Sequence, residues 1–195
     1  CGDAFDTSGD GRGRYFMVPS AGMGTGGRAA VDGAMAAGLM SRLLKAGFGF
    51  DCSLRIVNAA MLFKSTDESL ATLDVACIDL FTGRTELCKA GAAPTLVRRS
   101  GRTGRASCSS LPAGILRDVS FDRASIELAP GDLLVLLSDG AVSGGTDWIC
   151  AQLEQFEDGD VRELAESIAS AARRRRDDGH EDDITVLTAL VRKAV

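Results

Sequence analysis

The chain has 195 residues, of which 45% are hydrophobic and 25% charged, a composition typical of a globular domain with a substantial core. Its formal net charge of -5 argues against nucleic acid as the main partner, and its apolar runs are too short to span a membrane. Its six cysteines show no Cys-x-x-Cys spacing, so we expect reduced thiols and a cytoplasmic domain. The chain begins Cys1-Gly2-Asp3, which reads as the middle of a strand, so we interpret it as the C-terminal fragment of a longer protein.

The first predicted elements are a strand, a glycine-rich loop and two helices. Residues 14–18 form an apolar run typical of a buried strand. Apolar residues at helical spacing predict helices over about 28–45 and 53–64, and either Asp51 or Ser53 is suited to cap the second helix.

The rest of the chain predicts mainly antiparallel strands. Residues 100–110, rich in Gly, Ser, Arg and Thr, predict an exposed loop. Residues 161–174 predict a helix, and strand-like apolar patterns occur at 73–80, 85–89, 96–98, 125–128, 132–137 and 184–191.

The loop PSAGMGTGG, residues 19–27, admits three interpretations: a phosphate cradle, a plain turn, or a metal-site loop that lacks one residue. Its Gly22-x-Gly24-x-x-Gly27 spacing satisfies the dinucleotide pattern, which is a weak signal alone. A second helix, rather than a parallel strand, is predicted after the first helix. That order argues against a nicotinamide-binding oxidoreductase.

Carboxylates recur where predicted strands begin or end. Asp139 follows a fully apolar strand, Glu181–Asp183 directly precede the last strand, and Asp3 lies near the start of the chain. An Asx turn is the alternative role for Asp139. Adjacent carboxylates repel one another unless a cation lies among them, and oxygen ligands without His or Cys favour Mg²⁺ or Mn²⁺. The single histidine, His180, is interpreted as structural.

Several motifs occur in an order that resembles the metal-dependent (PPM, type 2C) serine/threonine protein phosphatases, in particular those of sporulation-type sigma factor control. They are Gly2-Asp3, Gly22-Met23-Gly24-Thr25-Gly26, Leu111-Pro112-Ala113-Gly114, Ser138-Asp139-Gly140 and Asp182-Asp183-Ile184-Thr185-Val186. The resemblance spans residues 1–195 and implies a single domain of the α+β class. Its expected architecture is a four-layer α-β-β-α sandwich of two antiparallel sheets flanked by helices.

The resemblance implies two Mn²⁺ or Mg²⁺ ions that activate water for attack on phosphoserine or phosphothreonine. By their positions in the motifs, Asp139 and Asp182 would be the catalytic metal ligands, joined by the carbonyl of Gly22 and by Asp3. The family motif is Asp-Gly-Met-Gly, whose Asp bridges both metals, and Ala21 stands at that position. We therefore interpret the glycine loop as a bridging-ligand loop without its ligand, which leaves at most one ion tightly bound.

Two functional interpretations follow: a phosphatase impaired at Ala21, or a catalytically dead pseudophosphatase that binds phosphoproteins. The family's substrate in this subgroup is a phosphorylated anti-sigma-factor antagonist, a small STAS-domain protein. The parent protein would be membrane-anchored, with no membrane contact by this domain itself, and a homodimer is left open.

Gly33 and Gly38 weaken the helix at 28–45, so we expect it to move with the next helix as a regulatory element. Close packing through small residues is the alternative role for these glycines.

Overall fold

A computed structural model describes residues 2–64, 69–107, 110–117, 121–157, 159–175 and 182–193 of the protein. The expectations for His180 and Glu181 lie outside the described residues. The chain divides into two compact units, Cys1–Ala92 with Cys108–Glu127 and Ala93–Ser107 with Leu128–Val195. Each unit has its own antiparallel sheet and its own hydrophobic core.

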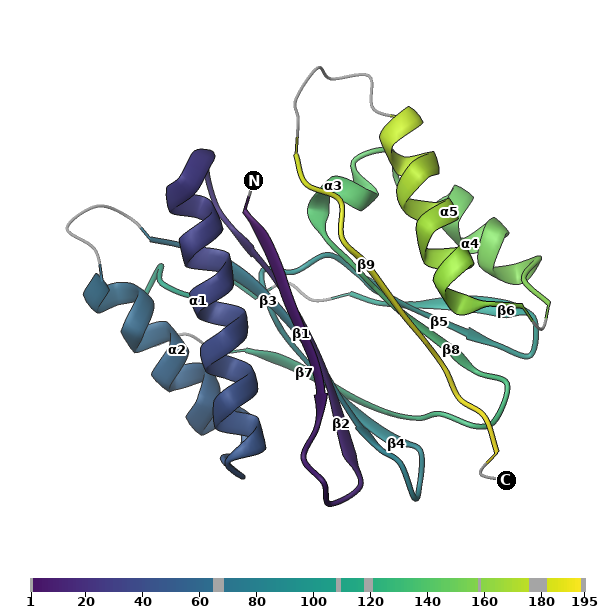
Figure 1. Ribbon diagram of the computed structural model, residues 1–195, viewed down its shortest axis with the longest axis horizontal. Helices are drawn as coiled ribbons and strands as arrows, with labels where there is room; N and C mark the ends of the chain where they lie inside the picture. Colours follow the sequence, from purple (N-terminus) through teal and green to yellow (C-terminus); the bar gives the residue numbers. More distant parts are fainter. Residues whose placement is uncertain are drawn as a thin grey trace. The chain divides into compact units, whose positions relative to one another are not determined.

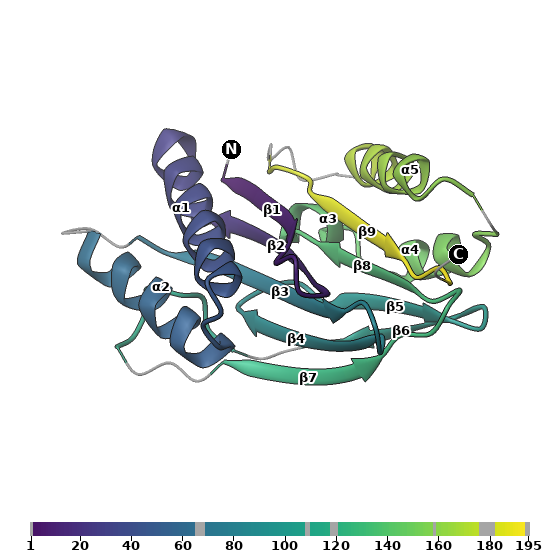
Figure 2. The same cartoon turned by 60° about the horizontal axis from the view of Figure 1, so that its bottom comes forward.

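The first unit is a five-stranded sheet with two helices packed on one face (Figure 1). Its strands, in spatial order, are β1 (Asp3–Gly9), β2 (Arg14–Gly22), β3 (Ala71–Asp79), β4 (Arg84–Ala90) and β7 (Asp122–Glu127). The helices are α1 (Gly26–Lys45) and α2 (Phe50–Lys64). Figure 2 shows both helices on the same side of this sheet.

Side chains of a strand alternate between the two faces of the sheet, and this alternation separates the core from the site. Phe16 and Val18 of β2 lie in the core beneath the helices, with Leu73, Val75, Met40, Leu54 and Met61. Ala21 is an odd-numbered residue of β2, so it points to the opposite face.

Helix α2 begins earlier in the sequence than expected. The carbonyl of Gly49 accepts a hydrogen bond from the Ser53 amide at 3.0 Å, so the first helical turn already contains Phe50 and Asp51. The predicted capping role of Asp51 or Ser53 is therefore wrong. The buried Phe50 side chain joins the core, and this packing draws the first turn into the helix.

The second unit is a four-stranded sheet with three helices among its described residues. Its strands, in spatial order, are β6 (Arg102–Ala106), β5 (Thr95–Arg99), β8 (Leu133–Leu137) and β9 (Val186–Leu190). The helices are α3 (Asp139–Val142), α4 (Asp147–Glu154) and α5 (Val161–Arg174), and only α5 was expected from the sequence.

Residues 102–106 form strand β6, so the expectation of a loop across them is wrong. Ser100 and Gly101 both have positive φ, at 49° and 74°, which suits the two-residue turn of a tight β-hairpin. The Thr103 amide donates to a Glu154 carboxylate oxygen of α4 at 2.9 Å, so a helix side chain satisfies the edge of the sheet.

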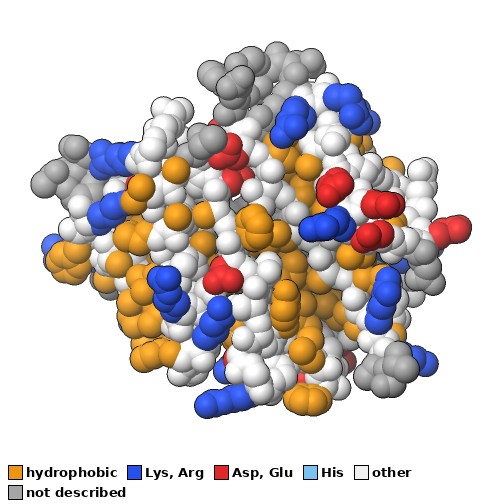
Figure 3. Space-filling model, in the orientation of Figure 1, with side chains coloured by type: hydrophobic (Ala, Val, Ile, Leu, Met, Phe, Trp, Pro, Cys, Tyr) orange, Lys and Arg blue, Asp and Glu red, His pale blue; other side chains and the backbone are white. Residues whose placement is uncertain are grey.

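Charged residues of both signs are interspersed with hydrophobic side chains on the face of the protein that Figure 3 shows. None of the helices within the described residues is both long enough and apolar enough to cross a membrane.

Candidate active site

Ala21 lies between Asp3 and Thr72 on one face of the first sheet. The β1–β2 register pairs Asp3 with Ala21, and the β2–β3 register pairs Ala21 with Thr72. Side chains directly opposite one another have Cβ atoms about 4.5–5.5 Å apart, so any longer side chain at position 21 would lie beside the Asp3 carboxylate. The Thr72 hydroxyl oxygen accepts a hydrogen bond from the Ala21 amide at 3.1 Å. A side chain at position 21 therefore lies next to Asp3 on one side and Thr72 on the other.

Gly22 lies where β1, β2 and α1 approach one another through their backbones. The Gly22 amide donates to the Gly2 carbonyl at 2.8 Å. A Cβ atom at Gly22 would lie 2.0 Å from the Ala29 carbonyl oxygen, and one at Gly33 would lie 2.1 Å from the Gly2 carbonyl oxygen. Only glycine fits at either place, so the position of the Gly22 carbonyl depends on this close packing.

The structure distinguishes the two glycines that were expected to weaken α1. Gly33 packs against the Gly2 backbone, in agreement with the alternative of close packing. At Gly38 the nearest atom to an added Cβ would be Arg42 Nη1, at 3.8 Å, so an alanine there would make only an ordinary van der Waals contact.

Asp139 and Asp182 lie at the same end of the β8–β9 pair in the second unit. Leu137 of β8 pairs with Val186 of β9, and beyond that pair the Ser138 amide donates to the Thr185 carbonyl at 3.0 Å. Asp139 follows directly as the first residue of α3 and is solvent-exposed, as is Asp182. This pairing brings Asp139 and Asp182 to the same end of the β8–β9 pair.

The predicted ligands offer only oxygen atoms, which suits Mg²⁺ or Mn²⁺. Asp3 and Gly22 belong to the first unit, whereas Asp139 and Asp182 belong to the second. Within the described part of either unit, no three His, Cys, Asp or Glu side chains are grouped to hold a metal ion. The oxygen donors of these residues fit Mg²⁺ or Mn²⁺, and Ala21 adds no donor side chain to those of the first unit.

Thr72 and the buried pair of Lys89 and Asp74 were not found from the sequence. The Lys89 ammonium donates to the Asp74 carboxylate, and both side chains are almost fully buried. Asp74 lies two residues from Thr72 on the same strand and therefore on the same face. No local sequence motif marks these residues, so their positions near Ala21 can be known only from the pairing of the strands.

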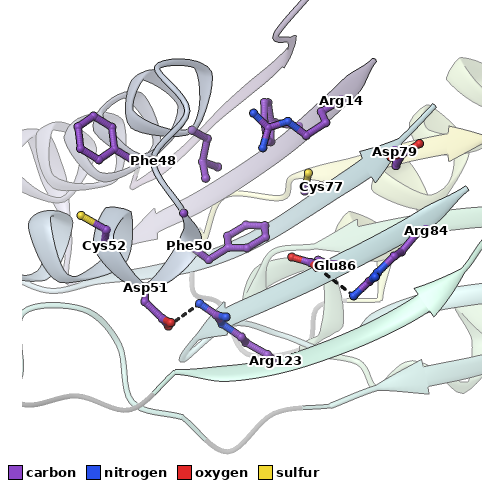
Figure 4. A pocket seen from close by; sticks show the side chains of 13 residues that line it. Arg14, Phe48, Phe50, Asp51, Cys52, Cys77, Asp79, Arg84, Glu86 and Arg123 are labelled. Carbon is purple, nitrogen blue, oxygen red and sulfur yellow. Dashed lines mark hydrogen bonds and ion pairs between the residues drawn. The ribbon is translucent and has the colours of Figure 1, made fainter. Parts of the chain in front are cut away.

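A separate cavity of about 560 Å³ in the first unit contains none of the predicted ligands (Figure 4). The Phe50 ring and the Cys77 thiol point into it, and burial raises the pKa of that thiol to about 11. Its charged side chains balance one another, including the ion pairs Arg123–Asp51 and Arg84–Glu86. Because these charges cancel, the lining favours neither an anionic nor a cationic ligand.

Comparison with known proteins identifies the family of this chain. The family model of stage II sporulation protein E (SpoIIE) matches residues 11–192. Stage II sporulation protein E of Bacillus subtilis is 28% identical over 196 residues, which is 97% of this chain but 24% of the relative. The chain thus spans about a quarter of that relative's length.

Solved structures show the same fold. The PP2C phosphatase domain of B. subtilis SpoIIE, solved with a fragment of its regulatory domain, superposes with a TM-score of 0.87 at 27% identity. That match covers 98% of this chain and 57% of the other. A manganese-presoaked SpoIIE phosphatase domain from the same organism gives a TM-score of 0.59 at 26% identity, covering 100% and 86% of the two chains. The predicted α+β class with two antiparallel sheets is confirmed, and the chain belongs to the SpoIIE family of PP2C-type phosphatase domains.

Proposed function

We propose that this domain hydrolyses phosphoserine or phosphothreonine in a protein, and that Ala21 leaves its activity weak or absent. The proposed substrate is a phosphorylated STAS-domain anti-sigma-factor antagonist in sporulation-type sigma factor control. One observation carries the proposal: Ala21 stands opposite Asp3 and directly before Gly22, where the family motif has a carboxylate. The proposed setting is one domain on the cytoplasmic side of a membrane-anchored parent protein.

Asp139, Asp182, Asp3 and the carbonyl of Gly22 are the proposed ligands of Mn²⁺ or Mg²⁺. Divalent ions bound there would lower the pKa of an attacking water and neutralise charge on the phosphate. The protein's own part is to hold these oxygens in place through strand pairing and through the close contact of Gly22 with Gly2. The loss of an outer hydrogen-bonding partner already costs about 10- to 100-fold in affinity or activity, and a missing ligand should cost more.

A second candidate function is a pseudophosphatase that binds phosphoproteins without hydrolysing them. Ala21 itself favours this candidate, because two close dications repel one another strongly unless an anion lies between them. The retained carboxylates Asp139 and Asp182 favour the enzyme.

Restoring the carboxylate separates the two candidates. We expect Ala21→Asp to release phosphate from a phosphorylated STAS-domain protein at least about tenfold faster than the parent chain at matched Mn²⁺. Chelator and a further Asp139→Asn substitution should both abolish the gain. Equal rates for the parent and Ala21→Asp would overturn the proposed role of position 21.

A further inference from the structure

Residues 110–117, which contain the Leu111-Pro112-Ala113-Gly114 motif, are attached to α2 by one buried side chain. Asn58 donates through Nδ2 to the Leu116 carbonyl at 2.9 Å and accepts through Oδ1 from the Gly114 amide at 2.8 Å. Asn58 is 3% exposed. Both ends of its amide are therefore used to hold this segment.

The same segment is attached to the start of β3. The Ala113 amide donates to the Ala71 carbonyl at 2.9 Å, and the Ala71 amide donates to the Ala113 carbonyl at 3.1 Å. Ala71 pairs on its other side with Gly22 of β2. The Met23 amide also donates to the Leu70 carbonyl, at 2.9 Å. Hydrogen bonds, joined by short stretches of backbone, thus connect α2 to the residues around the Gly22 carbonyl.

Steric contacts explain why two further positions of the motif, Pro112 and Gly114, hold these residue types. Pro112 packs on Gly91, where a Cβ atom would lie 2.6 Å from the proline ring. Gly114 has a φ of 97°, and a Cβ atom there would lie 2.3 Å from the Ser69 carbonyl oxygen. A larger residue at either glycine would push the segment away from β3.

We infer that Asn58 is a positioning residue, which acts through residues 113–116 and Ala71 to hold Gly22 and Met23 in place. It touches none of the proposed metal ligands, so its effect on them is indirect. The positioning itself is independent of catalysis. Its consequence for the reaction rests on the proposed phosphatase function.

Ser53 provides a matched control for Asn58. It lies on the same helix and is also fully buried, and its hydroxyl has no hydrogen-bond partner among the described residues. Asn58→Ala and Ser53→Ala therefore both remove a buried polar group from α2, but only the first removes the connection to residues 113–116.

Amide hydrogen exchange, followed by NMR in the parent chain, tests the inference without any metal. We expect Asn58→Ala to speed exchange at Met23, Ala71 and Ala113 by at least about tenfold relative to Ser53→Ala. Exchange at Phe16 and Cys77, at the far end of the same central strands, should not change. Acceleration that is equal at both ends, or absent at both, would overturn the inference. If Asn58→Ala does not fold, Asn58→Asp retains the acceptor for Gly114 and should give the same pattern with a smaller increase.

A second arm uses the Ala21→Asp background. There we expect Asn58→Ala to weaken Mn²⁺ binding and lower kcat, each by at least about fivefold, with KM unchanged, and Ser53→Ala to change neither. If Ala21→Asp alone releases no phosphate, the proposed function fails, whereas the exchange result still decides the role of Asn58. Unchanged Mn²⁺ affinity and kcat in an active background would limit Asn58 to a structural role.

Discussion

At the scale of single residues, the proposed loss of activity depends on position 21. Ala21 stands opposite Asp3, and the Ala21 amide donates to the Thr72 hydroxyl. With alanine there, Asp3 has no carboxylate opposite it on β2. With aspartate, two like charges would face one another across the strand pair, which is unfavourable unless a cation lies between them.

This repulsion predicts a stability effect of Ala21→Asp that depends on divalent ions. In chelator, the variant should unfold at a temperature about 0.4–4 °C below the parent, because a like-charged cross-strand pair costs about 0.2–1 kcal/mol. With saturating Mn²⁺ the order should reverse, because bound ions stabilise the folded state by mass action. Thermal unfolding followed by circular dichroism makes the comparison. Unfolding temperatures that respond equally to Mn²⁺ in both proteins would contradict this prediction.

At the scale of elements, helix α1 is attached to the site through Gly33 and not through Gly38. Gly33 contacts the Gly2 backbone, beside the Gly22 carbonyl, whereas Gly38 has open surroundings. The Lys64 ammonium of α2 also forms an ion pair with the buried Asp32 carboxylate, next to Gly33. The regulatory movement of α1 and α2 stays a proposal, and these contacts are the ones through which it would reach the Gly22 carbonyl.

The two glycines should respond in opposite ways to alanine. Gly38→Ala should raise the free energy of unfolding by about 0.5–1 kcal/mol, because alanine is the better helix former and its Cβ meets no close atom. Gly33→Ala should lower it by about 1–3 kcal/mol, because its Cβ would overlap the Gly2 carbonyl. Urea unfolding measures both, and each variant is the control for the other. Two stabilising substitutions would mean that Gly33 does not pack closely.

The elements that could be predicted are those with a local signal. Helix α5 has strong apolar periodicity, and the Asp160 side chain caps it by accepting from the Arg162 amide. Strand β6 was missed because its sequence is polar, and its edge is completed by Glu154 from a helix far along the chain. Its Ser100-Gly101 turn was the one available signal.

The residues of the candidate site also divide into those with a local sequence signal and those without one. Asp139 and Asp182 are proposed from the sequence because each lies in a motif beside an apolar strand. Thr72 becomes a neighbour of position 21 only through strand register. Asn58 contacts Gly114 across 56 residues of sequence, which no local pattern encodes.

At the scale of the whole molecule, the proposed ligands come from both compact units. Asp3 and Gly22 lie at a strand end in the first, and Asp139 and Asp182 at a strand end in the second. An aspartate at position 21 would add the proposed bridging carboxylate to the first of these sets, opposite Asp3. The number of ions that bind is therefore the property most sensitive to this residue.

Calorimetric titration with Mn²⁺ tests this central claim most directly. The parent chain should bind at most one ion tightly, and Ala21→Asp should bind two, because the restored carboxylate reduces the repulsion between adjacent dications. Asp139→Asn in the Ala21→Asp background is the control and should lose tight binding. Two tight sites in the parent chain, or the same number in both proteins, would contradict the assignment of Ala21 as the lost bridging position.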